Sequence, residues 1–286
     1  MNDKGHSFYV LIAAILAVST AAPLAKFCAD VHPIAIGMWR TLLVGCLLGL
    51  TVKTKDLQLH TKDWVLAFLA GSLLAGHFWS WFASLHHIST LRSTVLVCLS
   101  PVWTGILEGL LLKRMPARRF WLGIGCALIG VACMSGDGFT KGNILGDSLA
   151  LLGGLLGAIY LIVGRVVRQR VDIGPYGAII CLSCACWLWV IGMLLSVPFL
   201  NFQQSSWIAL LALALGPQLT GHIGLNYAMR YIAASTVAML LLLEPIGAAI
   251  ISGVFLNDIP SKSEVLGSFI ILLGLLIGIN RSRAQR

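Results

Sequence analysis

The sequence predicts an all-α integral membrane protein whose ten transmembrane helices form two inverted five-helix repeats. First, the 286-residue chain is 58% hydrophobic and only 11% charged, whereas a soluble domain carries roughly 25% charged residues. Second, the apolar runs approach the roughly 20 residues that a spanning helix needs, and the length allows about ten of them. Third, the chain contains the same two-helix pattern twice.

The repeated pattern occupies residues 88–134 and 232–280, which are related by a constant offset of 144 residues. The offset superimposes matched pairs of residues, namely Pro101 and Pro245, Pro116 and Pro260, Gly123 and Gly267, and Gly130 and Gly274. Self-similarity at a fixed distance indicates a repeated structural unit. We therefore expect two repeats, residues 1–138 and residues 139–286.

Taken in order, the apolar runs predict ten spans near residues 8–26, 33–52, 64–85, 92–112, 119–136, 146–166, 175–197, 206–224, 231–255 and 264–280. The first run could pass for a signal peptide. We expect a retained helix because nine more spans follow and no clear cleavage motif precedes the first loop. The longest polar stretch, residues 136–146, lies where the repeat boundary should be.

The positive charges predict the orientation of these spans. Of the 20 Lys and Arg residues, fifteen fall on the side of the N-terminus, four fall on the other side, and Arg40 lies inside a span. Such a bias marks the cytoplasmic side, so we expect a multi-pass protein of the cytoplasmic (inner) membrane with both termini in the cytoplasm. Because each repeat has an odd number of spans, the second repeat must start from the opposite face. Topology also explains the net charge of +9 without a nucleic-acid partner.

Two paired segments resemble a known family. They are LSPVWTGILEGLLLKRMP (residues 99–116) and LEPIGAAIISGVFLNDIP (residues 243–260), each followed by a glycine-marked helix. They are similar to the ten-helix EamA-type branch of the drug/metabolite transporter superfamily, as is the Met38-Trp39-Arg40 segment. Members usually carry Gly-Glu where this chain has Lys113-Arg114 and Asn257-Asp258. The resemblance implies an exporter or exchanger with a central cavity lined by both halves, and substrates such as amino acids and related small metabolites.

The residues themselves favour the same class of protein. Inverted repeats that share a central site are a recurring plan of secondary transporters, in which the two halves exchange roles by alternating access. We expect a small-molecule substrate, above all an amino acid or a related zwitterion. The alternative is a nucleoside-type metabolite such as S-adenosylmethionine, or an organic cation or drug.

Other classes of function are disfavoured. The sequence has no Walker-type phosphate loop, and it lacks the His-Glu-x-x-His or Ser/His/Asp patterns of an intramembrane enzyme. We expect no cofactor and no metal, because Cys181, Cys184 and Cys186 do not supply the four ligands of a closed zinc site. Small-xxx-small glycine pairs fit contacts within the monomer or a homodimer face equally well.

Charges within spans are the first candidates for function. Each costs at least about 2.5–3.5 kcal/mol at the bilayer centre, so each should face the interior and have a partner. Arg40 could grip a substrate carboxylate, or it could be a structural partner of Glu108 or Glu244, or extend to the interface. Glu244 is a candidate site for a cation or a proton, and Glu108 is a candidate for coupling or gating.

Prolines, histidines and aromatic residues complete the candidates. Pro101 and Pro245 lie in the middle of matched spans, where proline frees a backbone carbonyl, so they are either hinges or simple packing kinks. The histidines could move protons or only contact neighbouring helices, and the tryptophans could line a cavity or lie at the membrane interface. The candidate substrate-binding residues are Arg40, His77, Trp81, Trp103, Tyr160, His222, Asn226 and Glu244, and the candidate coupling or gating residues are Glu108, Pro101 and Pro245.

Overall fold

The structure is a computed structural model that describes residues 3–88, 93, 96–134, 143–256 and 261–278. Helices are the only regular elements among these residues. The helices of the first half are α1 (Asp3–Ser19), α2 (Ala21–Ala25), α3 (Pro33–Thr51), α4 (Thr61–Ser84), α6 (Ser100–Leu112) and α7 (Arg118–Met134), with a short 3₁₀ turn at Thr54–Leu57. The predicted repeat boundary at residue 138 lies outside the described residues.

The second half repeats this order. Its helices are α8 (Ile144–Val167), α9 (Ile173–Leu194), α10 (Gln204–Leu213), a π-helical segment (Ala214–Ile223), α11 (Gly224–Ala228), α12 (Ala234–Leu240), a 3₁₀ turn (Leu241–Leu243), α13 (Glu244–Leu256) and α14 (Lys262–Gly278). Within the described part of the chain, seven continuous helical segments are long and apolar enough to cross a membrane. The spans formed by α6, α7 and α14 are shorter helices of 13, 17 and 17 residues. The predicted fold of ten transmembrane helices is confirmed.

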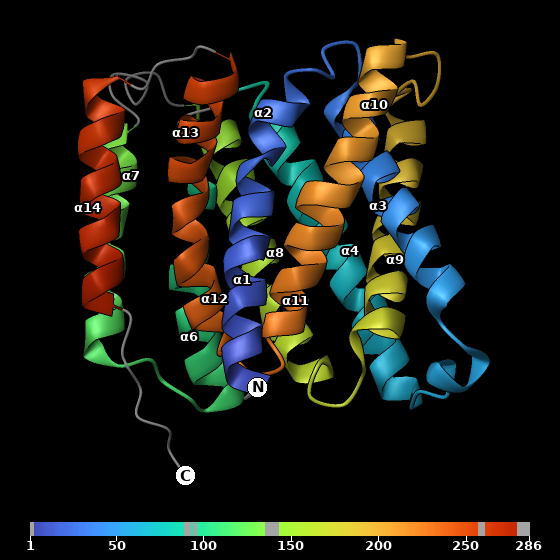
Figure 1. Ribbon diagram of the computed structural model, residues 1–286, viewed down its shortest axis with the longest axis horizontal. Helices are drawn as coiled ribbons and strands as arrows, with labels where there is room; N and C mark the ends of the chain where they lie inside the picture. Colours follow the sequence, from blue (N-terminus) through green and yellow to red (C-terminus); the bar gives the residue numbers. More distant parts are fainter. Residues whose placement is uncertain (1–2, 89–92, 94–95, 135–142, 257–260, 279–286) are drawn as a thin grey trace.

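The helices alternate in direction along the bundle, with some helices in front of others, such as α14 in front of α7 (Figure 1). We call the face at which α1 begins the N-terminal face. The first helix of the second half, α8, begins at the opposite face and ends at the N-terminal face, so it runs antiparallel to α1. The two halves are therefore inverted, as the odd number of spans in each repeat predicts. Large apolar side chains such as Leu122 and Leu276 point outward and are 66% and 78% exposed, which suits a surface covered by lipid.

Matched glycines join the last helices of the two halves, α7 and α14. A Cβ atom added to Gly123 would lie 2.5 Å from the Gly274 carbonyl oxygen, and one added to Gly130 would lie 2.6 Å from the Gly267 carbonyl oxygen. The 144-residue offset converts the residue pair Gly123–Gly274 into the pair Gly267–Gly130. The helices thus pack backbone to backbone about a pseudo-twofold axis, as small residues allow in membranes. Cys126 lies beside this axis, because its thiol donates to the carbonyl of its own counterpart, Ile270, at 3.6 Å.

The fourth and ninth spans are both interrupted just before their matched prolines. Helix α6 starts at Ser100 and α13 starts at Glu244, which are matched positions, and the proline is the second residue of the new helix in each case. Pro101 frees the Val97 carbonyl oxygen because proline has no N–H to donate. This oxygen faces Gly154 of α8, where an added Cβ atom would lie only 3.0 Å from it. The break therefore packs directly against the neighbouring helix of the other half.

Candidate functional site

Arg40 lies near the middle of α3 and is only 5% exposed. Its Nε atom donates a hydrogen bond to Gln218 Oε1 at 3.0 Å, and its guanidinium carbon lies 4.8 Å from the centre of the Phe78 ring. A buried guanidinium needs such partners because it is charged in an apolar interior. The partners come from α4 and from the π-helical segment, so Arg40 joins the first half to the second. Neither of the expected glutamates supplies this hydrogen bond.

His77 on α4 packs against the glycine face of α8. Its Nδ1 atom lies 2.8 Å from the Gly153 carbonyl oxygen, and because a carbonyl only accepts, Nδ1 carries the proton. A Cβ atom on Gly157 would lie 3.0 Å from the same nitrogen. The ring of Trp81, one turn further along, is nearly parallel to the His77 ring with centroids 6.4 Å apart. The small residues of α8 therefore make room for this aromatic pair.

His222, Tyr160 and Asn226 meet near Phe78. The His222 ring lies edge-on to Phe78 at 5.7 Å and at 6.5 Å from the Tyr160 ring. The Asn226 side-chain amide donates to the His222 carbonyl oxygen at 2.7 Å and to the Tyr160 hydroxyl. His222 and Asn226 lie one helical turn apart, and the first of these bonds joins the Asn226 side chain to the His222 backbone. Together, Arg40, His77, Phe78, Trp81, Tyr160, Gln218, His222 and Asn226 form what we call the interior polar cluster.

Several buried side-chain polar atoms lack a hydrogen-bond partner in the described part of the chain. They are the indole nitrogens of Trp81 and Trp103, the Tyr176 hydroxyl, His222 Nδ1 and Asn226 Oδ1. Buried polar groups are almost always paired in proteins, by protein, water or ligand. Glu244, at the start of α13, is within electrostatic range of Arg40. The interior thus presents unpaired polar atoms together with a guanidinium and a carboxyl group.

Glu108 lies outside the interior polar cluster, close to the N-terminal face. Its Oε2 atom accepts from the Ser235 backbone N–H at 3.3 Å, near the start of α12, and the charge of Arg165 lies nearby. Both helix ends are at the N-terminal face, where the fourth span ends and the ninth begins (Figure 1). The hydrogen bond ties these two spans together at that face. Among the described contacts, Glu108 therefore acts away from the interior polar cluster.

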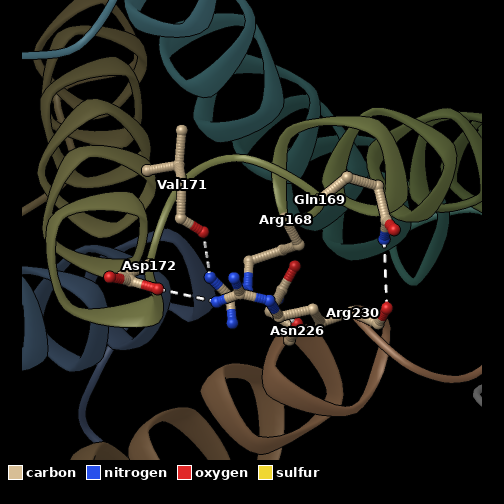
Figure 2. A network of polar contacts seen from close by, with 6 residues as sticks. All are labelled: Arg168, Gln169, Val171, Asp172, Asn226 and Arg230. Carbon is tan, nitrogen blue, oxygen red and sulfur yellow. Dashed lines mark hydrogen bonds and ion pairs between the residues drawn. The ribbon is translucent and has the colours of Figure 1, made fainter.

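A second polar network fastens the turn between α8 and α9 to the end of α11 (Figure 2). The Arg168 guanidinium, only 1% exposed, donates to the Asn226 carbonyl oxygen at 3.1 Å and to the Val171 carbonyl oxygen. Gln169 Nε2 donates to the Arg230 carbonyl oxygen, and Arg230 forms an ion pair with Asp172 at 2.6 Å. Burial lowers the pKa of Arg168 to about 10, so it remains charged at neutral pH. Asn226 connects this network to the interior through its side chain.

Three residues of these sites carry weak signals in the sequence. Gln218 is a polar residue in an apolar run. In the sequence, only Pro217 before it indicates that the hydrogen bonding changes from α-helical to π-helical there. Phe78 resembles any other apolar residue of a span. Arg168 counts as one more positive charge of the N-terminal side, although it is buried and bonded to carbonyl groups.

Ten helices in inverted halves, with charged and polar side chains of both halves meeting inside, define a membrane transporter. The family model of the EamA-like transporter family matches residues 6–136 and 144–279. The chain belongs to this family, part of the drug/metabolite transporter superfamily. The two matched stretches correspond to the two halves of the structure.

Related sequences and a solved structure agree with this assignment. The chain is 27% identical to YwfM of Bacillus subtilis, described as an uncharacterized transporter, over all of this chain and 97% of that protein. It is 24% identical to an uncharacterized transporter of Archaeoglobus fulgidus, with 97% and 98% of the two chains covered. A crystal structure with 19% identity superimposes with a TM-score of 0.84 over 96% of this chain and 97% of the other, which shows the same fold.

Proposed function

We propose that the protein is a secondary transporter that moves small zwitterionic metabolites, above all amino acids, by alternating access around the interior polar cluster. The observation that carries the proposal is the contact between Arg40 and Gln218. It joins the two inverted halves in the interior, where transporters built from inverted repeats bind their solutes. The breaks before Pro101 and Pro245 would let the fourth and ninth spans bend during the exchange.

The chemistry of the cluster supports a substrate with a carboxylate. The Arg40 guanidinium and the unpaired indole N–H of Trp81 can only donate hydrogen bonds. A carboxylate accepts from such donors, whereas an uncharged apolar solute leaves them unpaired. Glu244 supplies the opposite charge for an ammonium group. A zwitterion satisfies both, which is the reason that amino acids are proposed first.

The experiment that tests this proposal has two stages. Purified protein is first screened by thermal unfolding against amino acids, nucleosides and quaternary amines, because a ligand that binds the folded form raises its apparent stability. The ligands found are then used for counterflow in sealed liposomes. We expect saturable counterflow of at least one amino acid. Stabilisation by nucleosides or amines alone would refute the substrate class, and binding without movement across the bilayer would refute a carrier.

An organic cation is the second candidate, and one specific observation favours it. The nearly parallel rings of His77 and Trp81 lie in the same interior as Glu244. Aromatic faces and a carboxylate are the usual partners of a quaternary ammonium group. Choline, used as the probe in the same screen, would then stabilise the protein, and Glu244→Gln would abolish that stabilisation.

We also propose that the N-terminal face is cytoplasmic and that the protein resides in the inner membrane. The support is the excess of Lys and Arg on that face, including Lys113 and Arg114 after α6. Single cysteines at Lys113 and Lys262, in a cysteine-free background, distinguish the two orientations. We expect a membrane-impermeant thiol reagent added to intact cells to label the cysteine at Lys262 and to spare the cysteine at Lys113.

A further inference from the structure

Gln218 lies in a stretch of the eighth span whose turns are wider than those of an α-helix. The residues Ala214–Ile223 have π-helical hydrogen bonding, and Pro217 lies inside them. The Thr220 hydroxyl accordingly bonds to the carbonyl oxygen of Leu215, five residues back, at 3.0 Å. Proline has no N–H to donate, so it cannot continue the α-helical pattern. Wide turns of this kind are rare and are frequent at functional sites.

Both polar ends of the Gln218 side chain are used. Its Oε1 accepts from Arg40 Nε, and its Nε2 lies 3.5 Å from the Cys181 sulfur on α9. The direction of the amide follows from chemistry, because a guanidinium has only donors and must face the oxygen. Gln218 is fully buried, so water does not compete for these contacts.

These contacts fix the plane of the guanidinium. Gln218 holds the Nε side, and the Phe78 ring lies against the group at 4.8 Å. Since Nε is already bonded, a carboxylate can form two parallel hydrogen bonds only with the two terminal nitrogens of Arg40. The amide of Gln218 is neutral, so it orients Arg40 without cancelling its charge.

We propose that Gln218 is the positioning residue that presents Arg40 end-on to the carboxylate of the substrate, and thereby determines the specificity for carboxylates. The inference rests on the proposed function of the interior polar cluster. It adds that specificity depends on a residue that does not touch the substrate. It also explains why the eighth span contains a wide turn at this level, since the turn places a fully buried amide against the neighbouring span.

The test exchanges the neutral amide for a charged group of the same shape. In Gln218→Glu, the new carboxylate pairs with Arg40 and cancels the charge that the substrate needs. The probes are the common amino acids and the amide of each one that binds, with affinities measured by thermal shift on the purified full chain. We expect the affinity for the acid to fall at least tenfold and the affinity for its amide to change by less than threefold.

Two further variants separate positioning from folding. Gln204→Glu makes the same exchange at an exposed position at the start of α10, and it should leave both affinities unchanged. Gln218→Met keeps the length of the side chain without its hydrogen bonds, and it should weaken the binding of the acid more than that of the amide. In the background of Arg40→Met, which has no positive charge at this position, Gln218→Glu should reduce the affinity for the acid by less than a further threefold, because a residue that acts through Arg40 has lost its target.

The outcomes distinguish this inference from the proposed function. If the wild-type protein binds no carboxylate-bearing solute, both the substrate class and the role of Gln218 are wrong. If it binds amino acids and Gln218→Glu weakens acid and amide equally, only the role of Gln218 is wrong. If Gln218→Glu fails to fold, the deciding measurement is the ratio of the affinities of Gln218→Met for the acid and for its amide. A ratio equal to that of the wild-type protein overturns the inference.

Discussion

Asp63 on α4 and Arg170 in the turn between α8 and α9 form a salt bridge that joins the two halves at the N-terminal face. Arg170 donates to one carboxylate oxygen from Nε at 3.1 Å and from a terminal nitrogen at 2.6 Å. Asp63 is the third residue of α4, and the third residue of α10 is Ser206, whose hydroxyl donates to Asp30 at the opposite face. Arg170 and Asp30 each lie three residues before the next long helix. The two contacts therefore occupy equivalent places in the inverted halves.

Removing the charge of Arg170 should destabilise the protein. The Asp63 side chain is 4% exposed, so Arg170→Gln leaves a buried carboxylate without its partner. Because Arg170 itself is about half exposed, we expect a loss of about 1–2 kcal/mol, between the values for surface and buried pairs. Asp63→Asn should reduce the stability less, because the buried side chain is then neutral and the half-exposed Arg170 can be solvated. Thermal unfolding of both single variants and of the double variant measures the coupling energy between Asp63 and Arg170. If the two losses of stability simply add, the salt bridge does not stabilise the protein.

The pair of His32 and His86 should make the stability depend on pH. Burial, and then the charge of His86, lower the pKa of His32, whose Nδ1 accepts from the Ile34 N–H at the start of α3. A lowered histidine pKa means that the folded form favours the neutral ring. The associated stability is therefore complete above the unfolded pKa of about 6.5 and is lost as the pH falls below it. We expect the midpoint temperature of thermal unfolding to decrease as the pH is lowered from 7.5 to 5.

Two variants test this account. His32→Asn keeps an acceptor for the helix N-terminus but does not titrate, so its stability should vary less over the same pH range. His86→Gln removes the neighbouring charge, so the decline should be shallower and should begin at lower pH. An unaltered pH profile in His32→Asn would assign the effect to other groups.

The glycine contacts between α7 and α14 should be equally intolerant of substitution in both halves. In Gly130→Ala on α7 and in its counterpart Gly274→Ala on α14, the new methyl group meets a backbone carbonyl oxygen of the other helix at 2.6 Å, so the helices must separate. We expect each variant to lose about 1–3 kcal/mol, as overpacked interiors do. Gly125→Ala is the control, because no heavy atom lies within 4 Å of its added carbon. A large difference between the two halves in thermal unfolding would argue against the pseudo-twofold packing.

Gly164 on α8 should be required for the geometry of the interior polar cluster. A Cβ atom there would lie 2.8 Å from Asn226 Oδ1 and 3.1 Å from the Tyr176 hydroxyl. We expect Gly164→Ala to displace Asn226, to break its hydrogen bond to Tyr160 and to weaken substrate binding at least fivefold. The control is Gly174→Ala, where the nearest atom is an ordinary contact at 3.7 Å. Binding measured by thermal shift that is equal in the two variants would contradict this role of Asn226.

The sequence predicts the architecture well because its signals are local or periodic. Apolar length gives the spans, and the constant offset relates Pro101 to Pro245, so the start of α6 at Ser100 also predicts the start of α13 at Glu244. The alternating direction of successive helices then follows from the number of spans. Each of these inferences needs only neighbouring residues or a repeated pattern.

Partners across the bundle are harder to predict. Arg40 and Gln218 are 178 residues apart, and no local pattern states that one will reach the other. The sequence favours a glutamate as the partner of a buried arginine, and nothing in it points to a neutral amide in a widened turn. Glu108 shows the same difficulty, since its actual contact is the backbone N–H of Ser235. Such pairs depend on the rotation of each helix about its axis, which apolar composition does not specify.

The equivalent contacts at the two faces differ in how they respond to dissolved ions. The Asp63–Arg170 pair attracts through opposite charges on a half-exposed group, and mobile ions weaken such an attraction. At the other face, the Asp30 carboxylate accepts from a neutral hydroxyl and from the Gln203 N–H, and this contact depends little on ionic strength. A rise in salt on one side of the bilayer would thus loosen the halves there, while the same rise on the other side would leave them joined.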